Sequence, residues 1–173
     1  AEISGLHLES YLREYFKYFP DGVKTKKMCI DTLRNAPALI KYVPKNILDE
    51  DIYNEAGACS FEVLPLDSEF ARQFAFKLVE EKPELLARIP YNIGNYKELA
   101  IYALSHLNYA AKINLLSKQS PDYKDIIIEL LRKGIVRLKD LSKEDLDGDM
   151  CIAAVFNDGR YLSDVPEKFI DRD

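Results

Sequence analysis

Residues 28–44 of this chain read MCIDTLRNAPALIKYVP, and residues 150–166 read MCIAAVFNDGRYLSDVP. The two stretches share an opening Met-Cys-Ile and a closing Val-Pro at the same spacing. Self-similarity of this kind is typical of proteins built from repeated supersecondary units, in which apolar positions are contacts between repeats. The two stretches therefore predict a repeat protein.

The closing proline recurs along the chain and serves as an anchor for aligning the repeats, which are about 24 residues long. The anchors are Pro20, Pro44, Pro65, Pro90, Asn114, Ser142 and Pro166, where Asn114 and Ser142 replace the proline. Repeat positions are counted back from the anchor, and position −1 is apolar in every copy. Position −4 is also always apolar: Phe16, Ile40, Phe61, Leu86, Ala110, Leu138 and Leu162. Position −11 is apolar in five copies: Leu33, Val79, Ala103, Leu131 and Val155.

The spacing within a unit is helical. Met28, Ile30 and Leu33 recur at the interval of a helix face, and the Asn-Ala-Pro turn at residues 35–37 breaks the pattern. A shorter second helix then carries positions −4 and −1 and ends at the anchor, because proline cannot continue the hydrogen-bond ladder. Each unit is thus predicted to be an αα-hairpin that buries its apolar stripe only by stacking on its neighbours.

We therefore predict an all-α fold of about six stacked αα-hairpins in one domain spanning residues 1–173. An aromatic-rich helix in residues 1–22 is expected to cap the repeats of residues 23–173. The chain is expected to be a fragment of a longer protein. Helix starts are predicted at Asp67-Ser68 and at Asn95, where Glu98 completes a capping box.

The composition restricts the function classes. The chain has 47% hydrophobic residues, 31% charged residues and a formal net charge of −5. A nucleic-acid polymer is not an expected partner, because such domains usually carry a clustered basic face. No apolar run is long enough to cross a bilayer, so no membrane partner is expected either.

Residues that carry catalysis or bind metals form no recognisable motif. Cys29, Cys59 and Cys151 lack a CxxC spacing and are predicted to be buried structural thiols in a reducing compartment. The acidic run from Asp145 to Asp149 lacks the glycine and glutamate positions of an EF-hand, and predicts instead a turn that caps a helix starting near Met150. We expect no catalytic residues, no metal site and no cofactor.

The tyrosine content is high, with 11 Tyr, 8 Phe and no Trp. Four tyrosines share no repeat position and lie near expected loops and helix starts, where they could stack a flat heterocycle. Nearby basic side chains could meet a phosphate. This candidate ligand site comprises Tyr42, Tyr53, Tyr91, Tyr96, Lys41, Arg88 and Lys97. Ordinary packing and surface roles are the alternative for the same residues.

The last unit, CIAAVFNDGRYLSDVPEKFID, resembles a bacterial family of short tandem αα repeats of unknown function. The matching residues are Ala153, Ala154, Val155, Asn157, Gly159, Leu162 and Pro166. The resemblance implies a helical repeat module within large bacterial proteins, including secreted effectors of intracellular pathogens. Its motif contains no catalytic residues.

The predicted function is a non-enzymatic, helical-repeat binding module that mediates protein interaction. Its expected location is the cytoplasm, or the host cytosol if the parent protein is a secreted effector. The alternative is a nucleotide-binding domain that stacks an adenine-type base on the loop tyrosines. An exposed apolar patch would favour the first function, and an enclosed pocket with two facing rings beside a basic side chain would favour the second.

Overall fold

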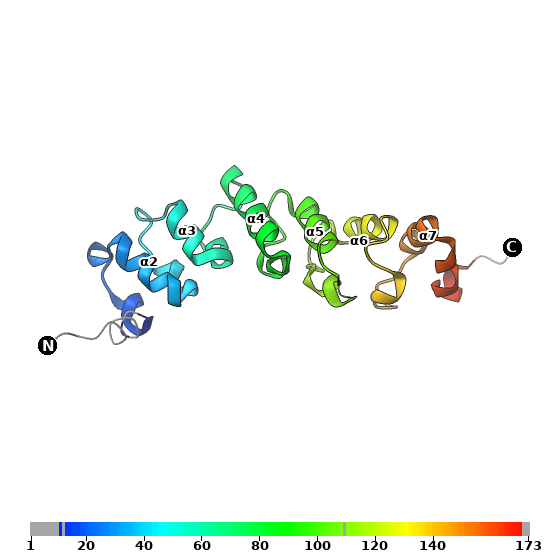
Figure 1. Cartoon of the computed structure of the whole chain (residues 1–173), viewed down its shortest axis with the longest axis horizontal. Helices are drawn as coiled ribbons and strands as arrows, with labels where there is room; N and C mark the ends of the chain where they lie inside the picture. Colours follow the sequence, from blue (N-terminus) through cyan, green and yellow to red (C-terminus); the bar gives the residue numbers. More distant parts are fainter. Residues whose placement is uncertain (1–10, 12, 109, 171–173) are drawn as a thin grey trace. The chain divides into compact units, whose positions relative to one another are not determined.

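The computed structural model describes residues 11, 13–108 and 110–170 (Figure 1). Every regular element within these residues is a helix, and no strand occurs among them. The prediction of an all-helical fold is therefore confirmed. Contacts divide the chain into two compact units, residues 1–71 and residues 72–173.

In the first unit, α2 (Lys26–Asn35) and α3 (Glu50–Ala56) pack against each other. Each is followed by a short 3-10 helix, η3 (Pro37–Tyr42) after α2 and η4 (Gly57–Glu62) after α3. The buried cluster between them includes Cys29, Leu33, Ile40, Ile52 and Cys59. These side chains project from both α-helices and both 3-10 helices, so the unit has one continuous apolar core.

The second unit contains most of α4 (Glu69–Glu81), together with α5 (Tyr96–Ser105), α6 (Tyr123–Arg132) and α7 (Gly148–Asn157). The intervening 3-10 helices are η5 (Pro83–Arg88), η6 (Ala110–Leu115), η7 (Leu138–Asp140) and η8 (Gly159–Asp164), and η9 (Glu167–Phe169) follows. Helix α5 packs on α6, and α6 packs on α7, so that the three lie side by side (Figure 1). The 3-10 helices also pack in series, with η5 against η6, η6 against η7 and η7 against η8.

The second segment of each predicted hairpin is a 3-10 helix, where the sequence predicted a short α-helix. Pro37 and Pro83 start η3 and η5, and each segment is six residues long. A six-residue segment that starts at a proline and ends at an extended residue can close few α-helical hydrogen bonds. The tighter 3-10 geometry closes its hydrogen bonds over three residues instead of four and is used in short pieces.

Ion pairs link the starts of successive α-helices within each unit. The Lys26 amine at the start of α2 lies 2.6 Å from an Asp49 carboxylate oxygen and 2.5 Å from one of Asp51, at the start of α3. The Lys124 amine of α6 lies 2.9 Å from Asp147, the residue that caps α7. The same arrangement in both units helps fix which helix ends lie together, although exposed pairs of this kind contribute little stability.

Two further predictions concern the N-terminal capping helix and the absence of membrane-spanning segments. Residues 1–10 and 12 of the predicted capping helix lie outside the described residues. The described part of this segment contains the 3-10 helices η1 (Phe16–Tyr18) and η2 (Asp21–Val23), and Phe16 is fully buried. None of the helices in the described residues has the length and apolar character needed to span a bilayer.

The three cysteines are free and buried, which confirms their prediction as buried thiols. Burial raises the pKa of Cys29, because desolvation disfavours the thiolate. The same cause, reinforced by the negative charge of Asp147, raises the pKa of Cys151. Both thiols therefore act as small apolar side chains at neutral pH.

Candidate functional site

Aspartate side chains cap the starts of both α7 and the 3-10 helix η8 that follows it. The Asp147 carboxylate accepts a hydrogen bond of 2.9 Å from the Met150 N–H, as predicted from the acidic run. At the other end, the Asp158 carboxylate accepts one of 3.0 Å from the Arg160 N–H and thereby starts η8. Asparagine and aspartate favour such caps because their short side chains reach the exposed N–H groups. The turn between α7 and η8 is thus fixed locally.

The two sides of α7 differ in burial. Met150, Cys151, Ala153 and Ala154 are buried, and α7 packs on α6. Ile152 and Phe156 are four residues apart, which places them on a common side of the helix. Their side chains are 69% and 85% exposed. The outer side of α7 is therefore apolar and open to solvent.

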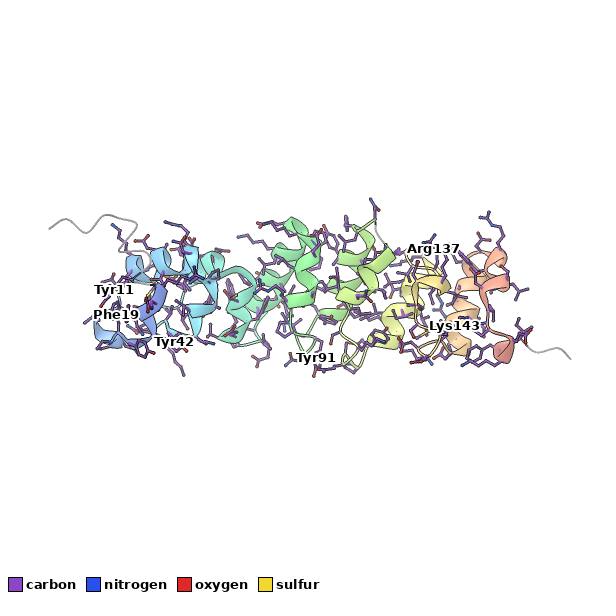
Figure 2. All side chains as sticks on the ribbon, turned by 90° about the horizontal axis from the view of Figure 1, so that it is seen from below. Tyr11, Phe19, Tyr42, Tyr91, Arg137 and Lys143 are labelled. Carbon is purple, nitrogen blue, oxygen red and sulfur yellow. The ribbon has the colours of Figure 1, made fainter. Side chains whose placement is uncertain are left out.

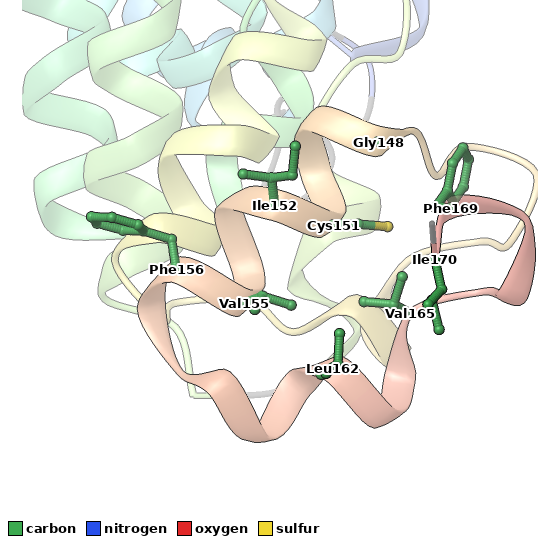
Figure 3. Close-up of a pocket in the computed structure, with 9 residues that line it drawn as sticks. All are labelled: Gly148, Cys151, Ile152, Val155, Phe156, Leu162, Val165, Phe169 and Ile170. Atoms are coloured by element: carbon green, nitrogen blue, oxygen red, sulfur yellow. The ribbon is translucent and has the colours of Figure 1, made fainter. Parts of the chain in front are cut away.

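The adjoining 3-10 helix extends this apolar surface. Leu162 on η8 is 54% exposed, and Val155 on α7 is half-buried. We call the surface formed by Ile152, Val155, Phe156 and Leu162 the α7–η8 face. In Figure 3, Leu162 points from η8 toward α7, whereas Phe156 points away from the other labelled residues.

An open hollow of about 470 Å³ lies within the α7–η8 face. Its lining comprises Gly148, Cys151, Ile152, Val155, Phe156, Leu162, Val165, Phe169 and Ile170 (Figure 3). The lining side chains are hydrocarbon apart from the Cys151 thiol, whose pKa is raised by burial. Such a surface can remove apolar groups of a partner from water, but it offers no charged group to polarise a substrate.

Charged groups at the start of α7 are already paired. The Lys124 amine lies 2.7 Å from the Asp149 carboxylate and 2.9 Å from that of Asp147. These two carboxylates raise the pKa of Lys124, so that the cation persists at neutral pH. The acidic run is thus engaged in helix capping and ion pairs. No group of three or more His, Cys, Asp or Glu side chains able to hold a metal ion occurs among the residues that the structure describes.

The candidate ligand site predicted from the tyrosines is distributed over both units. Tyr42, Lys41 and Tyr53 belong to the first unit. The Lys41 amine lies 5.7 Å from the centre of the Tyr42 ring, which is 36% exposed. Tyr53 packs instead against Phe70, with ring centroids 5.6 Å apart. Within this unit, the two predicted rings therefore have different neighbours.

The other predicted residues, Tyr91, Tyr96, Arg88 and Lys97, belong to the second unit. Tyr91 follows η5 and is partly exposed (Figure 2), whereas Tyr96 is only 2% exposed. The Tyr96 hydroxyl accepts a hydrogen bond of 3.0 Å from the Ser117 N–H, and burial raises its pKa. Arg88 is exposed in the last turn of η5, and the Lys97 amine lies 3.9 Å from the Asp125 carboxylate. Tyr96 thus links the start of α5 to the loop that follows η6.

The α7–η8 face was missed by sequence reasoning, which interpreted its residues as packing positions. One signal was present in the sequence. Phe156 occupies repeat position −10, where the units ending at Pro44, Pro90 and Ser142 carry the exposed charged residues Arg34, Glu80 and Arg132. Leu104 is buried at this position in the unit ending at Asn114, but an exposed phenylalanine where three units carry exposed charges indicates a surface with a special contact.

Comparison of the chain with protein-family models, with curated proteins and with solved structures finds no significant match. No residue role is therefore transferred from a relative. The most distinctive chemical feature of the described residues is the α7–η8 face, on which three large apolar side chains are more than half exposed: Ile152, Phe156 and Leu162.

Proposed function

We propose that the chain is a stack of short helical repeats, capped by residues 1–22, that binds another protein through the α7–η8 face. The observation that carries this proposal is the exposure of Ile152, Phe156 and Leu162 on one continuous surface. Single exposed apolar residues are common in soluble proteins, but a contiguous group around a hollow is typical of interaction sites. Binding, without catalysis, is the activity that such a lining supports.

The burial pattern along the predicted repeats supports the stacked architecture. At position −11, Leu33, Val79, Ala103 and Leu131 are all fully or almost fully buried. Position −4 is likewise buried at the five described side chains before Leu162: Phe16, Ile40, Phe61, Leu86 and Leu138. Equivalent positions are expected to have equivalent burial when each repeat packs on its neighbours.

The shape and composition of the face favour a protein over a small molecule. Small-molecule sites are usually enclosed and combine an apolar lining with a few converging polar groups. The hollow at α7 is open, and its lining side chains offer no carboxylate, amine or hydroxyl. A side chain or helix of a partner protein fits this environment better than a nucleotide does. Three buried free thiols fit a cytosolic location, where cysteines stay reduced.

The test is an affinity capture from cell extracts with the full chain and two variants. Phe156→Asp places a charge on the most exposed side chain of the face, and we expect it to abolish capture without unfolding the chain. Ser163→Asp is the matched control, because it adds the same charge at an exposed position seven residues further along. Captured proteins are then purified, and their Kd for each form of the chain is measured by calorimetry.

The proposal requires a purified partner that binds Phe156→Asp with a Kd at least about tenfold higher than it has for the parent chain. The Kd of the same partner for Ser163→Asp should equal that for the parent chain. A factor of this size corresponds to loss of one well-buried aromatic contact. Partners that bind both variants as tightly as the parent chain would show that the α7–η8 face is not the binding surface.

A further inference from the structure

The burial of position −4 in other repeats indicates which kind of element would cover the α7–η8 face. Leu86 and Leu138 occupy this position on η5 and η7 and are 0% and 2% exposed. Leu162 is the same residue type at the same position on η8 and is 54% exposed. Position −11 follows the same trend, since Val155 is half-buried where Leu131 is fully buried. The exposure therefore lies at the positions that are covered in the preceding repeats.

Three 3-10 helices, η3, η5 and η7, are contacted by the elements that follow them in the same way. In the first unit, η3 is contacted by the following α-helix and 3-10 helix, α3 and η4. In the second unit, η5 is contacted by α5 and η6, and η7 by α7 and η8. The buried position −4 of η3, η5 and η7 thus lies on a 3-10 helix that is covered by the following α-helix and 3-10 helix. The element that would cover Leu162 in the same manner is one more such hairpin.

The covering α-helices also share a chemical character. The buried residues of α5 include Ala100 and Ala103, and those of α7 include Ala153 and Ala154. Small side chains allow helices to approach closely, so that larger side chains of the neighbour fill the space between them. Helix α7 presents such larger side chains, Ile152 and Phe156, on its open side.

The α7–η8 face lacks the lysine that forms an ion pair with the next α-helix elsewhere in the chain. Lys26 and Lys124 stand 18 residues before their anchors and hold carboxylates at the start of the next α-helix. Gly148 occupies the equivalent position in α7 and also lines the hollow. A hairpin that docks here is therefore held by apolar contacts and not by this ion pair.

We propose that the α7–η8 face binds a helical hairpin of this same repeat type, carried by a partner protein. The hairpin consists of an α-helix of about ten residues with small apolar side chains on its docking side, followed by a short 3-10 helix. It covers Val155 and Leu162 in the way that α7 and η8 cover η7. This inference rests on the proposed function, because it names the class of partner that the same face receives.

The experiment appends one repeat to the full chain. A second copy of residues 150–173 is fused directly after Asp173, which places the new anchor one repeat length after Pro166. The fusion acts as a tethered partner, and the tether raises the effective concentration so that even weak docking is populated. Hydrogen exchange of the amides in α7 and η8 is compared in the parent and extended chains.

We expect the amides of α7 and η8 to exchange at least about tenfold more slowly in the extended chain, because burial of one leucine changes an opening equilibrium by a factor of this order. Leu162→Asp in the original repeat should remove this protection. The same substitution should have little effect on α6 in the parent chain, where Leu162 is already exposed. Ser163→Asp is the matched control, because repeat position −3 is exposed in the other units at Lys41, Glu62, Ala87 and Lys139. It should leave the protection intact.

Three results would overturn the inference. The first is unchanged exchange in the extended chain, and the second is protection that survives Leu162→Asp. The third is self-association of the parent chain, seen by light scattering over a concentration series and abolished by Leu162→Asp, which would identify a second copy as the occupant. If the fusion fails while Phe156→Asp still abolishes partner capture, the hairpin class is wrong and the proposed protein binding stands.

Discussion

Leu138 and Leu162 provide a stringent test of the structure, because the same residue type occupies repeat position −4 in two different environments. Leu138 is 2% exposed and Leu162 is 54% exposed. We expect Leu138→Ala to reduce the free energy of unfolding by about 2–5 kcal/mol, since it loses the transfer free energy of a buried side chain and leaves a cavity. We expect Leu162→Ala to cost about 1 kcal/mol, because half of its surface already faces water and the adjoining hollow is open.

The assay is urea unfolding followed by circular dichroism, combined with hydrogen exchange. Exchange is needed because units in a stack of repeats can open separately, in which case a single global transition does not report the local change. For Leu138→Ala, faster exchange should appear in η7 and in α7 and η8, which pack on η7. For Leu162→Ala, it should be confined to α7 and η8.

Equal losses of stability in the two variants would refute this reasoning. A large loss for Leu162→Ala would mean that its side chain is covered in solution, and a small loss for Leu138→Ala would mean that position −4 is not part of the core. The control is Ser163→Ala, which truncates an exposed side chain beside Leu162 and should change the free energy of unfolding by less than about 0.5 kcal/mol.

Three further predictions concern single side chains. Asp147→Ala removes the cap that accepts from the Met150 N–H and should reduce the free energy of unfolding by about 1 kcal/mol in urea titrations at pH 7. Tyr96→Phe leaves the Ser117 N–H without its acceptor and should cost about 1 kcal/mol in the same titrations. The Cys151 thiol, whose pKa is raised by burial, should react with a disulfide reagent much more slowly in the native protein than in urea, measured in a chain whose other cysteines are replaced by alanine.

The Asp147 prediction also has a pH dependence. Burial opposes ionisation, but the Met150 N–H and the Lys124 amine outweigh it and hold the pKa of Asp147 below its usual value. A carboxylate with a lowered pKa in the folded state contributes stability above the pKa of the unfolded chain, which is about 3.9, and loses it as the pH falls through the folded value. The difference between the parent chain and Asp147→Ala should therefore be constant from pH 5 to 7 and shrink below pH 4. A difference that grows on acidification would contradict this assignment.

Local features of the chain were predictable from sequence because they depend on neighbours along the chain. The spacing of Met28, Ile30 and Leu33 correctly predicted a helix, which is α2. The cap at Asp147 and the cap at Ser68, whose hydroxyl accepts from the Ala71 N–H, were also correct. A helix face and a helix cap involve residues three or four positions apart, so that the sequence order already contains the geometry.

Other local predictions failed where tertiary contacts compete with sequence preference. Asn95 precedes α5 as predicted, but its side chain makes no capping hydrogen bond, and its Oδ1 atom is buried without a hydrogen-bond partner. Tyr96 was grouped with loop tyrosines, yet its ring is buried and its hydroxyl binds a backbone group 21 residues away. Sequence order does not show which side chains a distant loop will cover.

The sequence by itself determined that the chain is all-helical, where its turns lie and which positions are apolar. It could not distinguish Leu138 from Leu162, because both satisfy the same pattern at the same repeat position. Only the tertiary structure decided that one is core and the other is surface, since η7 is packed against α7 and η8, whereas the open hollow adjoins Leu162 on η8. Burial depends on what packs against a residue, and the hydrophobic effect acts on the area that remains in contact with water.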